Sequence, residues 1–168
     1  MSSSAIVSTA IVLGTGLAAI VDLRTRKVPN VVTASLASTG VLVSFAGIGH
    51  VGFVASLLGL GLGVALMLPG HLFGATGAGD VKLFAAVGAF LGPAGILSAF
   101  LYTAIAGGVL AVVIAIRRGC ARRTIGGAAR FVASCAANRG AVEHLSVNNR
   151  FAYAPAIAIG AAVAALAR

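Results

Sequence analysis

The stretch from Ile96 to Ile116, ILSAFLYTAIAGGVLAVVIAI, indicates a membrane-spanning helix, because its 21 residues are mostly apolar and none is charged. About 20 such residues cross the roughly 30 Å hydrocarbon core of a bilayer as a helix. Five further apolar segments flank this one along the chain: Ala5–Val21, Val31–Gly49, Val51–Pro69, Val81–Gly92 and Phe151–Ala167. We therefore predict an all-α, polytopic membrane protein with six transmembrane helices that form a single domain over residues 1–168.

The composition excludes several classes of protein. Apolar residues make up 60% of the chain and charged residues 9%, against roughly 45–50% and 25% in soluble domains. A water-soluble enzyme, a disordered tail and a disulfide scaffold are therefore excluded. Twelve basic residues against three acidic ones give a net charge of +9. Because the basic residues lie between apolar segments, we expect them to face anionic lipid head groups, and we expect no nucleic-acid partner.

The basic residues also predict the orientation of the chain. They gather directly after the first apolar segment (Arg24, Arg26 and Lys27) and in the loop 117–150, whereas the loops after the second and fourth segments contain none. By the positive-inside rule, the charged side faces the cytoplasm and both termini lie outside. The loop 117–150 is either a basic amphipathic helix on the membrane surface or a solvated loop that fixes the topology. Positive charge follows the first segment instead of preceding it, so we expect no cleaved signal peptide.

Two of the three acids lie at the ends of apolar segments. Asp22 closes the first segment and Asp80 opens the fourth. Acids near membrane depth are costly and tend to mark function, and two carboxyl groups that meet can share a proton and activate water without a metal. The fourth segment rises only about 18 Å before Gly92-Pro93 breaks it, so Asp80 is expected inside the membrane slab. The alternatives are an end-of-helix residue for Asp22 and a helix N-cap for Asp80.

Short motifs surround both acids. Asp22 is followed after six residues by Pro29-Asn30, and Asp80 stands in Gly77-Ala78-Gly79-Asp80-Val81-Lys82. In this order and within a six-segment chain, the two motifs resemble those of the type IV prepilin peptidase family, which are intramembrane aspartyl proteases of the GxGD type. The resemblance implies that Asp22 and Asp80 are catalytic. It also implies cleavage of the positively charged leader of prepilin-like membrane proteins at the cytoplasmic face of the bacterial inner membrane, with no cofactor.

The chain departs from the larger members of that family. Those members carry an N-terminal cytoplasmic domain with paired Cys-x-x-Cys motifs, and this chain contains no such motif. It looks like the short, peptidase-only branch that serves Flp-type (tight-adherence) pili. We therefore do not expect the N-methyltransferase activity of many larger members.

Small and turn-forming residues are expected to support the two acids. Gly77 and Gly79 allow the backbone of a substrate to come close to Asp80. An extended substrate strand could pair there with exposed backbone groups. Pro29-Asn30 is expected to end the first loop and to start the next helix, with the Asn30 side chain as its cap.

The charged neighbours of the acids have more than one interpretation. Arg24 is expected to contact lipid phosphates, and the alternatives are a contact with a substrate carboxylate or an influence on Asp22. Lys82 follows Asp80 by two residues, so on a helix it points to a largely different face and reaches toward the membrane surface. Asp80 would lie at a helix N-terminus and Asp22 at a helix C-terminus, so the helix dipoles predict that a shared proton resides mainly on Asp22.

Other residues are expected to serve packing. The chain contains 23 glycines, which suit close helix contacts in membranes. Gly59, Gly61 and Gly63 are expected at packing or flexible positions of the third segment. Tyr102 and Tyr153 are expected at packing or interface positions.

Two other functions remain open at this point. Acids beside breaks in helices also occur in ion pathways, so a small transporter or proton channel is one alternative. A non-catalytic scaffold for pilus assembly is the other. A metal site is not expected, because the cysteines and histidines are too scattered to hold one: Cys120, Cys135, His50, His71 and His144.

Overall fold

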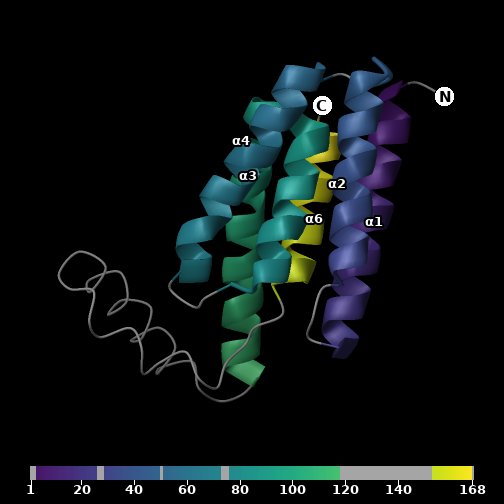
Figure 1. Ribbon diagram of the computed structural model, residues 1–168. Coiled ribbons are helices and arrows are strands. Elements are labelled where there is room, and N and C mark those ends of the chain that lie inside the picture. Colours follow the sequence, from purple (N-terminus) through teal and green to yellow (C-terminus); the bar gives the residue numbers. More distant parts are fainter. Residues whose placement is uncertain (1–2, 26–28, 50, 73–75, 118–152, 168) are drawn as a thin grey trace.

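The computed structural model describes residues 3–25, 29–49, 51–72, 76–117 and 153–167, and all regular structure in these ranges is helical. The helices pack side by side as one bundle (Figure 1). In chain order they are α1 (Ser3–Thr25), α2 (Asn30–Phe45), α3 (Phe53–Leu72), α4 (Ala78–Arg117) and α6 (Ala154–Leu166). The predicted all-α class is confirmed.

The helices have the lengths and surfaces of a membrane protein. α1, α3 and α4 are long and apolar enough to cross a membrane, and α2 and α6 are shorter apolar helices. Each helix also exposes large apolar side chains on the outside of the bundle, among them Leu13, Leu42, Leu58, Leu101 and Leu166. Water would disfavour so large an apolar surface, whereas lipid tails do not.

α4 consists of two helical segments that fold back on each other at Gly92, as Figure 1 shows. The rings of Phe84 and Phe100 lie 6.2 Å apart at their centroids, although a straight helix would separate these residues by about 24 Å. Gly92 has φ 64°, a left-handed conformation that glycine adopts without a Cβ clash. Pro93 begins the second segment, where its missing N–H is not needed. The predicted break at this position is confirmed.

Small residues bring α3 and the first segment of α4 into backbone contact. A Cβ atom on Gly59 would meet the carbonyl oxygen of Gly88 and, at 2.7 Å, the Cα of Gly92. The Ser56 hydroxyl donates a buried hydrogen bond of 2.7 Å to the carbonyl oxygen of Ala89. Gly88 and Gly92 are four residues apart and therefore share one helix face. This face packs the first segment of α4 closely against α3.

The first segment of α4 lies at the centre of the bundle. Leu83 and Phe84 have no exposed surface, and α4 contacts each of the other four helices. α6 packs between α4 and α1, where the Ser8 hydroxyl donates a hydrogen bond of 3.1 Å to the carbonyl oxygen of Ala165. The segment that begins with Asp80 is therefore enclosed by the rest of the chain.

Some helix ends differ from the prediction. α2 ends at Phe45 instead of Gly49, because the chain turns at Gly47, where φ is 69°. α4 begins at Ala78, so Asp80 is its third residue and lies inside the helix. Helix ends depend on capping and on turns, which an apolar pattern does not report.

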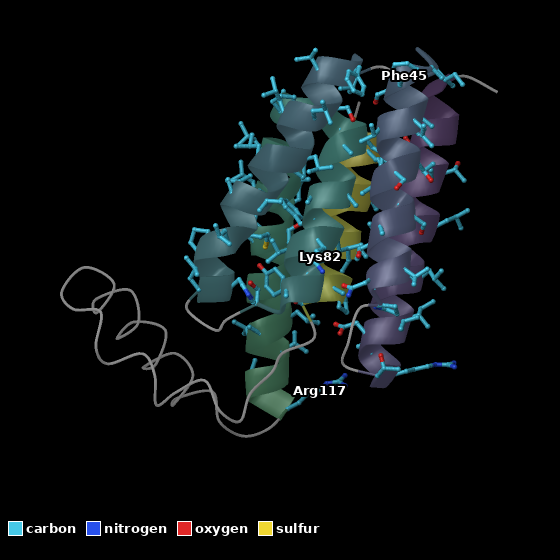
Figure 2. The ribbon with its side chains drawn as sticks, viewed as in Figure 1. Phe45, Lys82 and Arg117 are labelled. Atoms are coloured by element: carbon cyan, nitrogen blue, oxygen red, sulfur yellow. The ribbon has the colours of Figure 1, made fainter. Side chains whose placement is uncertain are left out.

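The charged side chains of the described residues gather toward one end of the bundle: Asp22, Arg24, Asp80, Lys82 and Arg117. Figure 2 shows Lys82 on the half that carries Arg117, with Phe45 at the opposite end. We call this half the Arg117 end. The beginning of α1 and the end of α6 lie at the other end (Figure 1). Several predicted features lie outside the described residues: the loop 118–150, Arg26, Lys27, His50, Cys120, Cys135 and His144.

Candidate active site

Asp22 is a buried carboxyl group in the last turn of α1. Its side chain is 6% exposed, and its Oδ2 atom has no hydrogen-bond partner among the described residues. The backbone N–H of Ala154, at the first position of α6, forms a hydrogen bond to this carboxyl group. An acid at the end of the first apolar segment is therefore held against a helix that comes more than 100 residues later in the sequence.

Asp80 is a second buried carboxyl group and is also 6% exposed. Its Oδ2 atom accepts a hydrogen bond of 3.0 Å from the backbone N–H of Gly77, the residue before α4. The carbonyl oxygen of Gly77 in turn accepts the N–H groups of Asp80 and Val81. This reach back from the third helical residue is one half of a capping box. Asp80 thus has a structural role in starting α4, close to the N-cap alternative raised from the sequence.

The turn that precedes Asp80 is closed by hydrogen bonds. The Thr76 N–H donates to the carbonyl oxygen of Gly70 at 3.2 Å, and Nδ1 of His71 lies 3.1 Å from the carbonyl oxygen of Thr76. Gly77 itself is exposed, so its backbone can be reached from outside beside the Asp80 carboxylate. Gly79 is the second residue of α4 and is half-buried.

The structure brings the two acids to the same region. Both lie toward the Arg117 end, on the neighbouring helices α1 and α4, and their carboxyl groups interact electrostatically. Each carboxyl group receives one backbone N–H from the start of a helix, Gly77 for Asp80 and Ala154 for Asp22. Partial positive charge at a helix N-terminus favours a carboxylate.

The second helix N-terminus alters the expectation for the shared proton. That expectation placed Asp22 only at the C-terminus of α1 and Asp80 only at the N-terminus of α4. The start of α6 also faces Asp22. The helix dipoles therefore no longer predict which of the two acids holds the shared proton.

The two motifs are joined by a direct contact. Nζ of Lys82 donates a hydrogen bond of 3.0 Å to Oδ1 of Asn30. The expectation that Asn30 caps α2 is wrong: Pro29 is the N-cap residue, no side chain caps this end, and the Asn30 side chain binds Lys82 instead. Lys82 is exposed, as expected for a face away from the buried Asp80. Arg24 is exposed in the last turn of α1, and no ion pair within the described ranges joins it to an acid.

Sequence reasoning missed the contribution of α6. Tyr153 was expected at a packing or interface position. It does lie against Gly107 of α4, and it also interacts electrostatically with Asp80. No local motif marks Tyr153 or Ala154, because their closeness to the acids arises only when α6 packs between α1 and α4.

Among the described residues, no three His, Cys, Asp or Glu side chains gather as a metal site would require.

One comparison with known proteins identifies a family for this chain. The sequence matches the profile of the type IV leader peptidase family over residues 9–112. The match covers more than half of the chain, contains both acids and ends before α6. No curated protein and no solved structure matches the chain.

Proposed function

Because the chain belongs to the type IV leader peptidase family, we propose that it is an aspartic endopeptidase that removes the leader from Flp-like prepilins with Asp22 and Asp80. Membership of the family makes it a peptidase, and its exposed apolar helices make it a membrane protein. One observation carries the assignment of the site. The two acids, one from each motif, are buried at one end of the bundle and interact electrostatically.

The proposed mechanism uses the two carboxyl groups in different protonation states. One carboxylate takes a proton from water while the other, as a carboxylic acid, donates a hydrogen bond to the scissile carbonyl oxygen. The water oxygen adds to the carbonyl carbon to form a tetrahedral intermediate. Collapse of that intermediate breaks the C–N bond. The leaving amine then takes the proton that the first carboxylate had received from water. The backbone N–H groups of Gly77 and Ala154 orient the two carboxyl groups throughout.

The proposed substrate is a membrane protein whose own apolar helix docks against the bundle. Its leader junction would then reach the Arg117 end, where the exposed backbone of Gly77 lies beside Asp80. Because the membrane confines enzyme and substrate to one plane, fewer relative positions must be sampled before the leader junction meets the active site. Exposed Gly77 lacks a side chain that would hold an extended peptide away.

The proposed topology has six membrane-crossing segments and both termini outside. α4 supplies two of them, because its two segments fold back at Gly92. Arg24, Lys82 and Arg117 all lie toward the Arg117 end, which the positive-inside rule assigns to the cytoplasm of a bacterial inner membrane.

The test is co-expression of this chain with a tagged Flp-like prepilin, with the size of the prepilin read on a gel. We expect the parent chain to shorten the prepilin. Asp22→Asn and Asp80→Asn should each lower the cleavage rate by at least about 100-fold, because each removes one partner of the proton transfers. Arg117→Gln, an exposed change at the same end of the bundle, is the matched control and should cleave as the parent does.

The outcomes separate the three functions considered. Cleavage that survives either Asn variant contradicts the aspartic mechanism. A parent chain that binds the prepilin without shortening it would be a scaffold. Proton flux in proteoliposomes that depends on both acids, without cleavage, would indicate a transporter.

A further inference from the structure

The last turn of α3 holds the backbone that leads into Asp80. The Thr76 N–H donates a hydrogen bond of 3.2 Å to the carbonyl oxygen of Gly70. The Thr76 carbonyl oxygen lies 3.1 Å from Nδ1 of His71, and a Cβ atom on Gly70 would come within 3.3 Å of the Thr76 side chain. Both backbone groups of Thr76 are therefore tied to two consecutive residues of α3, which ends at Leu72.

The partner of His71 decides which ring nitrogen carries the proton. A carbonyl oxygen only accepts hydrogen bonds, so Nδ1 of His71 is the donor and carries the proton. In the neutral imidazole, Nε2 is then the unprotonated nitrogen. Although His71 is exposed, its ring thus has a defined role as a hydrogen-bond donor to the turn before α4.

One peptide unit links His71 to Asp80. The Thr76 carbonyl and the Gly77 N–H belong to the same planar unit, in which the two groups point in opposite directions. His71 holds the oxygen of this unit at 3.1 Å, and the N–H of the unit donates to Oδ2 of Asp80 at 3.0 Å. A donor on the carbonyl oxygen polarises the amide and makes its N–H a stronger donor. The peptide unit therefore transmits both the orientation and the polarity of the imidazole N–H to the Asp80 carboxyl group.

We propose that His71 is a positioning residue of the active site. Through the peptide unit between Thr76 and Gly77, its Nδ1–H fixes the backbone N–H that orients the Asp80 carboxyl group for proton transfer. This inference rests on the proposed function. It adds the last turn of α3 to a site that is otherwise built from α1, α4 and the start of α6.

A purely structural role for His71 makes a different prediction. If the imidazole only closes the turn after α3, its loss lowers stability but leaves the cleavage rate of each folded molecule unchanged. If Nδ1–H positions Asp80, its loss slows the proton transfers and leaves substrate binding unchanged. Measurements of kcat, KM and thermal unfolding therefore distinguish the two roles.

The experiment compares His71→Leu and His71→Asn with the parent chain, purified in detergent, in cleavage of a Flp-like prepilin. Leucine and asparagine have the same branched shape, but only asparagine places an N–H donor where histidine has Nδ1. We expect His71→Leu to lower kcat about 5-fold, the size of one hydrogen bond, with KM unchanged. His71→Asn should recover most of this loss. The control is Leu72→Ala, which changes a side chain that is 75% exposed at the end of α3 and should keep the parental kcat.

The tautomer of His71 is measured independently of activity. In protein with isotope-labelled histidine, the nitrogen NMR signals of His71 are assigned by their loss in His71→Asn. At a pH where the ring is neutral, we expect a protonated Nδ1 and an unprotonated Nε2. A neutral His71 that carries its proton on Nε2 would overturn the inference, because the ring could not then donate to the Thr76 carbonyl oxygen.

The failure of this inference is distinct from the failure of the proposed function. Parental kcat in His71→Leu, together with inactive Asp22→Asn and Asp80→Asn variants, overturns the role of His71 and leaves the peptidase intact. Equal losses of kcat in His71→Leu and His71→Asn also overturn it, since the N–H donor would then not matter. Cleavage that persists in the two aspartate variants contradicts the proposed function itself.

Discussion

Asp80 is both the third residue of α4 and a proposed catalytic group, so its substitution changes two things at once. Its Oδ2 atom accepts the Gly77 N–H and stabilises the start of the helix. Asparagine keeps an oxygen that accepts this bond but cannot ionise, whereas alanine removes both properties. Asn variants therefore separate catalysis from helix capping, which is why the cleavage experiment uses them.

Within the described residues, the bond between Lys82 and Asn30 is the one side-chain hydrogen bond that joins the two motifs. It joins the start of α2 to the first turn of α4. We predict that Lys82→Met and Asn30→Ala each lower the stability of the protein in detergent by about 0.5–1 kcal/mol, because each leaves its partner without the bond. Their effects should be less than additive in the double variant, with a coupling of about 0.5 kcal/mol.

Thermal unfolding of the two single variants and the double variant measures this coupling. Arg117→Met is the control, since it removes an exposed cation without breaking a described hydrogen bond. Strictly additive effects of Lys82→Met and Asn30→Ala would mean that the contact contributes nothing to stability.

At the scale of helices, the packing of α3 on α4 depends on which glycines face the contact. Gly59 and Gly63 lie against the backbone of α4, whereas nothing lies within 4 Å of a Cβ atom on Gly61. All three were expected at packing or flexible positions of one segment. The alternation places Gly61 outside the contact, because residues 59 and 63 share a helix face that residue 61 does not.

This pattern gives a paired prediction on α3. Gly59→Ala should destabilise the protein by about 2–3 kcal/mol, because its Cβ would collide with the backbone of Gly88 and Gly92, which cannot rotate away. Gly61→Ala should change stability by less than about 1 kcal/mol. The thermal midpoint and the folded yield in detergent are the measurements, and equal effects of the two substitutions would argue against this helix contact.

At the scale of the whole molecule, all five described charged side chains lie toward the Arg117 end. The positive-inside rule then predicts that this end is cytoplasmic. Alkaline phosphatase, which is active only outside the inner membrane, should be active when fused after Gly49 or after Ala167. It should be inactive when fused after Arg117. The opposite pattern would invert the topology and place the acids on the outer face.

Local properties of the sequence determined much of this protein. Apolar composition gives a helical membrane bundle because the bilayer requires every backbone polar group to be bonded within the chain. Gly92-Pro93 predicts the fold back of α4 because the restrictions on φ at glycine and proline act within one or two residues. The two acids were recognised for the same reason, since each lies in a short motif that is readable without any long-range contact.

How these parts meet depends on the packing of the helices against one another. Three features of the structure join residues that are far apart in the chain. The start of α6 lies beside Asp22, Lys82 bonds to Asn30, and Gly59, unlike Gly61, packs against α4. Such contacts depend on how each helix is rotated and shifted against its neighbours. In apolar helices that are nearly uniform around their circumference, small-residue packing sets that rotation, and it can be read only from the assembled bundle.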